Sequence, residues 1–469
     1  MTSSWIGTGA RAAVRLALVA VCAGAVAAAV LVPWHAIERE PLSLSAQPVP
    51  SASILACTGP VLAAGRDSQQ AGSLSEAARQ RVTVGVTAGA TVPDERTLDI
   101  PDVSSGTGPE TFIAPPNGRE RTDLAAAGSA QVTDDDLSGF AASTCAPPRL
   151  ESWLVGGSAA VGAADLIMLS NPGEVAAQVD LTVYGGAGMD APAAGAGIVV
   201  PAGSQRIVPL ASLGIGEEAP VVRVTASGAP VHASLQTSII RTLVPGGVDH
   251  VGATSTPTQR QVIPAVTVTR APGEEGATDV TTLLRVLAPS DDGEATVTVT
   301  GVGQTQPADT QQVSLAAGVP LELELGGLAV GTYTVQIDAS VPVVGAVWET
   351  TGFGAGSDFA WYTSADEVGV PSLVAVASGS SPSLVLHNAG DADVAVELAE
   401  DAGTGDVDTV TVPAGQAVQL RVRGGEVYRL TTSGGGVRAA VEYSTGGRLA
   451  GYAVVPADAA AAEVRVYPQ

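Results

Sequence analysis

Few residues in this chain combine the side-chain types and the spacing that catalysis requires. His232 occupies an outward position of an expected strand, and nothing near it in the sequence completes a nucleophile–base pair, so we expect a surface histidine. Asp249 precedes His250, but the aspartate recurs as Asp358 in a second copy of the segment, where Phe359 replaces the histidine. We therefore predict that both aspartates are structural turn residues. No Gly-x-Ser-x-Gly elbow precedes a helix.

Acidic loops are the remaining candidates for a metal site. They lie at 134–136, 391–393 and 406–408, but their spacing lacks the bidentate acid that ends a twelve-residue calcium loop. We expect solvated loops, with weak calcium binding as the alternative. The segment GGSAAVG at 156–162 has no following lysine, so it is no phosphate-binding loop. The sequence therefore predicts no catalytic residue, no metal and no cofactor.

Aromatic residues are scarce, yet several gather around the Gly-rich segment TGFGAGSDFAWYTS. An exposed tryptophan beside other aromatic rings can stack on a sugar or seat a partner protein. Trp348 aligns with Gln236 and Glu442 at positions expected to face outward. The alternative is packing between the second and third repeats described below. The predicted contact residues for a glycan or partner protein are Trp348, Phe353, Phe359, Trp361 and Tyr362.

The elements that must position these residues are β-strands. The chain is rich in Val and Thr with 56 Gly and 31 Pro, and segments with helical periodicity are missing beyond residue 40. One pattern occurs three times: an apolar strand, a turn and a second strand that alternates apolar and polar residues. The three copies lie at 164–185, 281–301 and 381–401.

Two further segments recur after each copy. An Ala-Gly pair, predicted to form a hairpin-type turn with glycine at positive φ, stands at 202–203, 317–318 and 414–415. The segments 221–238, 333–351 and 428–445 are then predicted to be β-hairpins, with Val231, Ala233 and Leu235 facing inward in the first.

The repeat period of about 100 residues favours an all-β fold of three tandem immunoglobulin-like β-sandwiches, with a single barrel or propeller as the alternative. The predicted sandwiches span 150–262, 263–367 and 368–469. Residues 53–149 are predicted to form an irregular segment, in which 66–80 and 92–128 are poorly ordered or loosely packed.

The N-terminus is predicted to be a membrane anchor. Leu16–Trp34 is uncharged and long enough to cross a bilayer, and Arg11 and Arg15 before it set the N-terminus (1–15) in the cytoplasm. A Pro/Ser-rich stalk at 35–52 follows. Cleavage near Ala27–Ala29 with secretion is the main alternative, and a lipoprotein site at Cys22 is a weaker one.

Charge and cysteines narrow the location and the partners. The net charge is −25, and all 22 basic residues are arginine, which argues against nucleic acid and anionic lipid surfaces as partners. Outside the predicted membrane segment only Cys57 and Cys145 remain. In an exported region they are expected to form one disulfide, the alternative being two free thiols.

A family resemblance is carried by LACTGPVLAAG, LSGFAASTCAPPRLESWLVGG, LIMLSNPGEVAAQVDLTVYGGAG and VVPAGSQRIVPL. These segments resemble an actinobacterial family of large secreted or membrane-anchored proteins of unknown function. The resemblance implies an extracytoplasmic body and assigns no functional residues. We expect a non-enzymatic envelope scaffold or binding module. The alternatives are an enzyme of envelope carbohydrate or peptidoglycan metabolism and a passive spacer.

Overall fold

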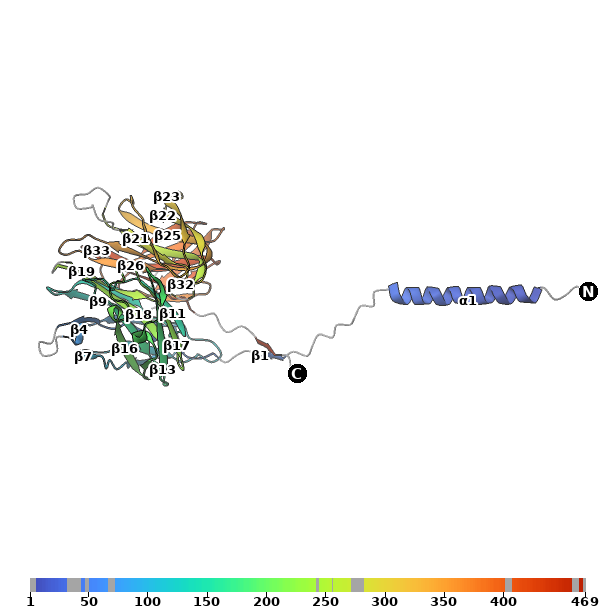
Figure 1. Ribbon diagram of the computed structural model, residues 1–469, viewed down its shortest axis with the longest axis horizontal. Helices are drawn as coiled ribbons and strands as arrows, with labels where there is room; N and C mark the ends of the chain where they lie inside the picture. The colour runs from blue at the N-terminus through green and yellow to red at the C-terminus, as the bar shows by residue number, and fades with distance from the viewer. Residues whose placement is uncertain are drawn as a thin grey trace, which may run out of the picture. The chain divides into compact units, whose positions relative to one another are not determined.

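The computed structural model describes residues 6–31, 44–46, 50–65, 72–241, 244–254, 256–270, 282–400, 407–457 and 464–466. The chain divides into two compact parts, a smaller part and the body. One comprises Met1–Pro48 with Ala461–Gln469, and the other is Val49–Ala460. The model is mostly β, with several small antiparallel sheets (Figure 1).

The smaller part contains helix α1 (Ile6–Leu31) and the pair of strands β1 (Leu44–Ala46) and β35 (Val464–Val466). Within the described part of the chain, no helix is long and apolar enough to cross a membrane. This does not support the predicted span at 16–34, of which residues 32–34 lie outside the described residues. Apart from β1 and residues 50–52, the predicted stalk also lies outside them.

The body, Val49–Ala460, consists of four consecutive β units. Unit I holds β2 (Ser53–Ala56), β3 (Val61–Ala64), β4 (Leu74–Ala78), β5 (Arg81–Val86), β6 (Asp94–Thr97), β7 (Val103–Ser105), β8 (Glu110–Ala114), β9 (Leu124–Thr133) and β10 (Ser138–Thr144). Unit II holds β11 (Glu151–Val155), β12 (Leu166–Asn171), β13 (Ala177–Gly185), β14 (Gly188–Asp190), β15 (Ile198–Val200), β16 (Ser204–Pro209), β17 (Val221–Ser227), β18 (His232–Arg241) and β19 (Val244–Gly252), with short 3-10 helices at Ala193–Gly195 and Leu210–Ser212.

The other two units continue the series. Unit III holds β20 (Thr258–Val268), β21 (Thr282–Leu287), β22 (Gly293–Gly301), β23 (Pro307–Leu315), β24 (Leu321–Glu324), β25 (Gly331–Thr350) and β26 (Phe359–Thr363). Unit IV holds β27 (Ser372–Ala375), β28 (Ser383–Asn388), β29 (Val394–Glu400), β30 (Val407–Val412), β31 (Ala417–Arg421), β32 (Val427–Thr432), β33 (Val437–Thr445) and β34 (Arg448–Ala453). β20 begins before the predicted boundary at 262/263.

Units II, III and IV repeat one strand order in two sheets. Unit II has β11-β17-β13-β14 and β16-β12-β18-β19, and unit IV has β27-β32-β29-β30 and β31-β28-β33-β34. In unit III the single long strand β25 serves both sheets. Asn171 and Asn388 even make the same set of side-chain bonds to the turns that follow them. The predicted threefold repetition is therefore visible in the pairing, whereas the immunoglobulin-like assignment stays a prediction.

The predicted hairpins are wrong in their pairing. β17 and β18 belong to different sheets, as do β32 and β33, and the equivalent segments of unit III are the two halves of β25. The Ala-Gly turns likewise lead from one sheet to the other, although Gly203, Gly318 and Gly415 do have positive φ. The reason is that a local turn signal does not say which sheet the next strand will join.

Unit I is better ordered than the sequence suggested. Its strands form the sheets β10-β9-β5, β2-β8-β6 and β3-β4-β7. Strands β4, β6, β7, β8 and β9 cover much of 72–80 and 92–128, so the expectation of poor order there is wrong, whereas the exposed strands β6 and β7 agree with its alternative of loose packing; residues 66–71 lie outside the described residues. The predicted disulfide Cys57–Cys145 is present and joins the ends of β2 and β10 within this unit.

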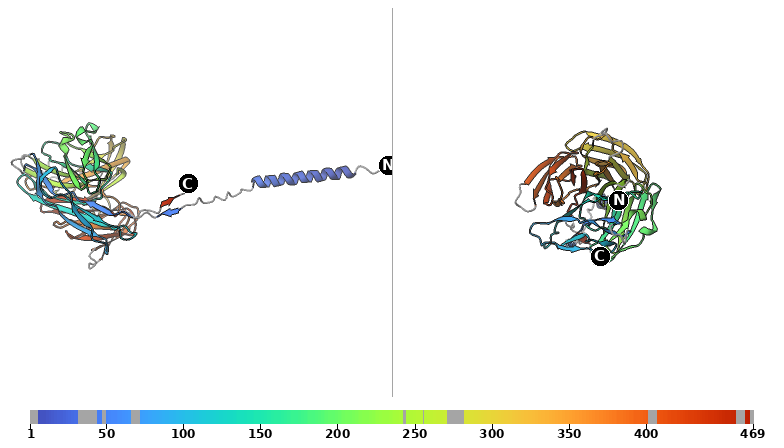
Figure 2. Two further views of the ribbon diagram at one scale, coloured as in Figure 1. Left: turned by 90° about the horizontal axis from the view of Figure 1, so that it is seen from below. Right: turned by 90° about the vertical axis from the view of Figure 1, so that its left-hand side faces the viewer.

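The four units close on themselves. β10 packs against β19 and β34, and β26 packs against the same two strands, so the last strands of all four units surround one centre. In the right-hand view of Figure 2 the sheets of the body follow one another around that centre. Unit IV thus returns to unit I, and we call the contact between these two units the closure seam.

Candidate functional site

The aromatic residues predicted to form a contact surface are in the interior. Trp348 is 7% exposed, Trp361 6%, and Phe359 and Tyr362 still less, while Phe353 is half-buried. Trp348, Phe359 and Trp361 join Trp153 and other residues of unit II in one core cluster. The prediction of an exposed aromatic site is therefore wrong. Trp348, Phe359 and Trp361 thus pack between the first and second repeats, whereas Tyr362 lies against Leu449 and Gly451 of the third repeat, as the alternative expected.

The reason is that both faces of the sheet β16-β12-β18-β19 and its counterparts are covered. Gln236, Trp348 and Glu442 occupy equivalent outward positions and are all buried. The Gln236 amide exchanges two hydrogen bonds with the main chain of Leu62 in unit I. Thr267 of unit III donates to Glu442. The face that alternation marked as wet is the face by which each unit packs on its predecessor.

His232 and His250 are also buried, although His232 was expected at the surface. His232 is 4% exposed, so the prediction of a surface histidine is wrong. His250 is buried too. Burial lowers the pKa of both side chains to about 4. His232 Nδ1 and both ring nitrogens of His250 have no hydrogen-bond partner, so neither imidazole is oriented as a general base would be.

Asp358 is the centre of the body. Its carboxylate accepts hydrogen bonds from the main-chain N–H groups of Phe140 (2.9 Å), Val248 (3.3 Å) and Leu449 (3.4 Å), which belong to units I, II and IV. Burial raises its pKa well above the usual value. Since the residue itself precedes β26 of unit III, one side chain connects all four units. A Cβ on Gly139 or Gly247 would lie within 3 Å of this carboxylate.

Asp249 makes the second such link. It lies within β19 instead of in the predicted turn, and its carboxylate accepts the N–H groups of Trp361 (2.7 Å) and His250 (2.8 Å). Burial raises the pKa of Asp249 to about 8 and that of Glu349 to about 8. These carboxyls serve as acceptors for the fold, and neither lines any of the four cavities described below.

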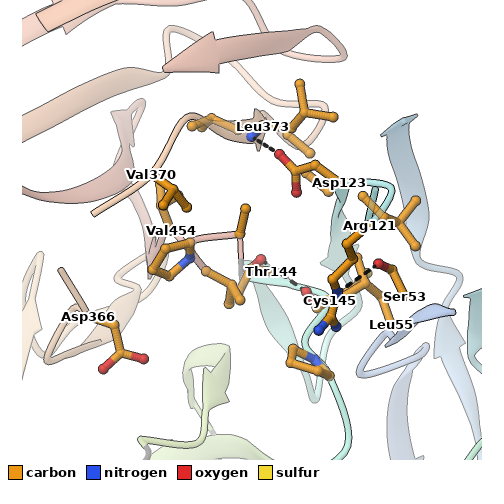
Figure 3. A pocket seen from close by; sticks show the side chains of 18 of the residues that line it. Ser53, Leu55, Arg121, Asp123, Thr144, Cys145, Asp366, Val370, Leu373 and Val454 are labelled. Atoms are coloured by element: carbon orange, nitrogen blue, oxygen red, sulfur yellow. Dashed lines mark hydrogen bonds between the residues drawn. The ribbon is translucent and has the colours of Figure 1, made fainter. Parts of the chain in front are cut away.

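The first of these cavities lies in the closure seam. It has a volume of about 370 Å³ and is walled by β2, by the start of β9 and by β27, with the Cys57–Cys145 disulfide beside it. Figure 3 shows Asp123 directed at Leu373, whose N–H it accepts at 2.7 Å, and Arg121 directed at Ser53. We call this space the seam cavity.

Charges of both signs surround the seam cavity. Arg121 and Arg149 contribute the cations, and Asp123, Asp366 and Glu367 the acids. Arg149 pairs with Asp366 at 3.6 Å, and Glu367 accepts the N–H of Gly436. The apolar part of the wall includes Leu55, Leu124, Val370, Leu373 and Val454. An apolar wall with a few fixed polar groups suits ligand binding.

The three remaining cavities lie between other parts of the units. A narrow one of about 50 Å³ contains His232 and Asp366, and one of about 310 Å³ lies beside Trp153 and Tyr184 between units II and III. The last, of about 820 Å³, lies in the closure seam and includes Ser129, Ser378 and Arg448. The sequence had no signal for either seam cavity, because their walls come from segments about 250 residues apart, as the Asp123–Leu373 bond shows.

The acidic loops show no metal geometry where they are described. No group of three or more His, Cys, Asp or Glu side chains that could hold a metal ion occurs among the described residues. Residue 406 of the loop at 406–408 lies outside them. Weak calcium binding stays a prediction.

The comparisons with known proteins give a family and little else. A family of unknown function (DUF5719) matches residues 102–423, which confirms the resemblance to such a family. The actinobacterial origin is not shown and stays a prediction. No curated protein matches the chain.

Two solved structures of the full-length major pilin RrgB from Streptococcus pneumoniae show a weak likeness. The first is 14% identical with a TM-score of 0.13, over 65% of this chain and 62% of the pilin. The second is 12% identical with a TM-score of 0.13, over 62% of this chain and 58% of the pilin. The chain therefore spans less than two thirds of these structures, and scores this low carry no argument about function.

Proposed function

The chain belongs to the family of unknown function DUF5719, and we propose that it is a non-enzymatic, extracytoplasmic scaffold or binding module of the cell envelope. The observation that carries this proposal is the use of the buried carboxyls. Asp358 joins units I, II and IV to unit III, and Asp249 joins unit II to unit III, each through main-chain N–H groups. The groups best suited to acid–base chemistry thus hold the body together.

The cavities support binding more than catalysis. In the seam cavity the carboxylate of Asp123 is engaged by a main-chain N–H, and the carboxylate of Asp366 by Arg149. A general acid or base must instead be free to exchange a proton with a substrate. The volume of about 370 Å³ falls in the range of small-ligand sites.

An extracytoplasmic location agrees with the disulfide. Cys57 and Cys145 are both buried and bonded, and structural disulfides persist in oxidising compartments. We propose that the body is held at the membrane by the N-terminal segment or released after cleavage there. Carbonate-washed membranes retain the intact chain in the first case. In the second case a processed form collects in the culture medium.

A photo-crosslinking experiment in intact cells tests the binding role. A benzoylphenylalanine placed at Val370, which lines the seam cavity and precedes β27, is compared with one at Val407, which is exposed on β30 at the other edge of the sheet that β27 begins. We expect a discrete adduct from position 370 that is missing from position 407. The same pattern from both positions, or no adduct from either, would show that the seam cavity binds no partner and leave a passive spacer.

A further inference from the structure

The cavity of about 820 Å³ in the closure seam differs from the other three in its charge. Its charged wall residues are Arg79, Arg81 and Arg448, and no acidic residue lines it. Each of the other three cavities has at least one carboxylate in its wall. The chain as a whole has 47 acidic and 22 basic residues. A wall with only basic charges therefore runs against the composition, and we call this space the arginine cavity.

Two of the three arginines flank a buried glutamine. Gln80 lies between them and is buried, and its side-chain oxygen accepts the N–H of Gly59. Arg79 and Arg81 on either side of it both line the cavity. Both are exposed, and neither forms a salt bridge with a described residue. Arg81 stands opposite Ser129, another wall residue, in the pairing of β5 with β9.

The third arginine comes from the other side of the seam. Arg448 begins β34 of unit IV, and its Nη2 donates to Ser138 Oγ of unit I at 3.0 Å. Its other terminal nitrogen, Nη1, is buried and has no hydrogen-bond partner. The Asp358 carboxylate is near enough to interact with the Arg448 charge. Arg448 therefore brings a positive charge to the cavity wall from the unit IV side of the seam.

Hydroxyl groups complete the wall. Ser378, Ser380 and Thr445 line the cavity, and Ser129 donates to the carbonyl of Ser378 across the seam. Gly379 lies against the Phe140–Tyr443 pair, whose ring centroids are 5.3 Å apart, and a Cβ there would be 2.7 Å from Tyr443. The two rings and Gly379 all line the cavity, so units I and IV are in contact at this part of its wall.

We propose that the arginine cavity binds an oxyanion group, phosphate or carboxylate, of a ligand from outside the protein. Guanidinium groups bind both anions through paired N–H donors, and serine and threonine hydroxyls supply further donors. The net charge of −25 repels anions at long range, so this local reversal of sign decides where an anion can bind. At 0.15 M salt the distant repulsion is screened beyond about 8 Å, while contacts inside the cavity are not.

Calorimetric titration of the full-length chain at 0.15 M salt tests the proposal and separates the two sources of oxyanion. Tripolyphosphate is the phosphate probe and citrate the carboxylate probe. We expect at least one of them to bind with one-to-one stoichiometry. The double variant R79Q/R81Q should weaken that binding about tenfold or more, because it removes two sets of charge-assisted hydrogen bonds. R79K/R81K should keep part of the affinity, since lysine retains the charge without the fork.

A matched control carries the same loss of charge elsewhere. Arg119 and Arg421 are exposed and line none of the described cavities, so R119Q/R421Q should bind the probe within about twofold of the unmodified chain. All four side chains are on the surface, and thermal unfolding confirms that the variants fold. Failure of both probes to bind at millimolar concentration would overturn the proposal, as would an equal loss in the control. The crosslinking at Val370 can succeed or fail independently, because it concerns a different cavity.

Discussion

The junction between units II and III and the closure seam between units I and IV are both contacts between β units, but they are built differently. At the first junction Trp348, Phe359 and Trp361 enter the core of unit II. The buried Arg285 of unit III donates to the carbonyls of Gly157 and Pro220 there. At the seam Phe140 meets Tyr443, and several links are single side chains bonded to the main chain.

The difference follows from the repeat. Units II and III share one strand order. The equivalent sheet of each unit therefore presents the same face to the unit that precedes it in the chain. Unit I has a different strand order and must meet the last copy, unit IV, to complete the closure. The two largest of the described cavities, the seam cavity and the arginine cavity, both lie at this junction, and a smaller one of about 310 Å³ lies between units II and III.

The largest loss of stability should come from replacing Asp358, which is bonded to residues on both sides of the closure seam and to unit II. Replacing Asp358 by Ala leaves the N–H groups of Phe140, Val248 and Leu449 without their acceptor in a buried place. At about 1–3 kcal/mol for each unsatisfied group, we expect a loss of about 5 kcal/mol in the free energy of unfolding. Denaturant titration measures it, with the exposed Asp135→Ala as control. A loss no greater than in the control would show that Asp358 does not join the units.

The aromatic junction should be next. Trp348→Ala removes a buried ring shared by two units, and large-to-small changes of this kind cost about 3–5 kcal/mol. The half-buried Phe353→Ala should cost less than half as much. Thermal unfolding of both variants separates them. If instead Trp348→Ala is neutral and abolishes crosslinking to a partner, the ring is a contact residue and the junction is not what holds it.

The disulfide tests how far unit I depends on a covalent link. Cys57→Ser with Cys145→Ser opens a loop with a sequence separation of 88 residues, which on the chain-entropy model removes about 2–4 kcal/mol. Limited proteolysis should then cut unit I first and spare units II–IV. Equal cleavage of all units would mean that the seam unfolds together with the aromatic junction.

The change in the free energy of unfolding per pH unit should be the smallest of these effects. Burial raises the pKa of Asp249 to about 8, from 3.8, so the folded state loses stability relative to the unfolded state progressively as pH rises from about 3.8 to about 8. The pKa values of His232, His250 and His387 are lowered to about 4, so stability is also lost as pH falls below 6.5. Between pH 4 and 6.5 the histidines and the buried acid therefore act in opposite directions, and from pH 6.5 to 8 only the loss from the acid remains, so urea midpoints should fall over that upper range. Each titrating group contributes a slope of about 1.4 kcal/mol per pH unit.

Asn in place of Asp249 sharpens this test. The variant should remove a loss of about 1.4 kcal/mol per pH unit throughout the range from about pH 4 to pH 8, because the unfolded carboxyl ionises near 3.8 and the buried one near 8. An unchanged loss over this range would assign it to another buried acid, of which Glu349 has the pKa nearest to that of Asp249.

The local sequence predicted the strands and, for some of them, which face is buried. The alternation that placed Val231, Ala233 and Leu235 inward is correct, and all three are in the core of unit II. The same alternation placed Trp348 and His232 on the opposite face, and the inference that this face is exposed to water is wrong. Alternation distinguishes two faces of a strand, but it cannot say whether water or another unit covers the second face.

What the sequence determined by itself was the β character, the threefold repeat, the disulfide partners and the acidic surface charge, because each depends on residue type or on spacing along the chain. The tertiary structure alone decided that a fourth unit closes the series, that β17 and β18 part into different sheets, and that Asp358 meets three other units. These outcomes depend on contacts between residues up to hundreds of positions apart. The two cavities of the closure seam exist only because the first and last β units meet.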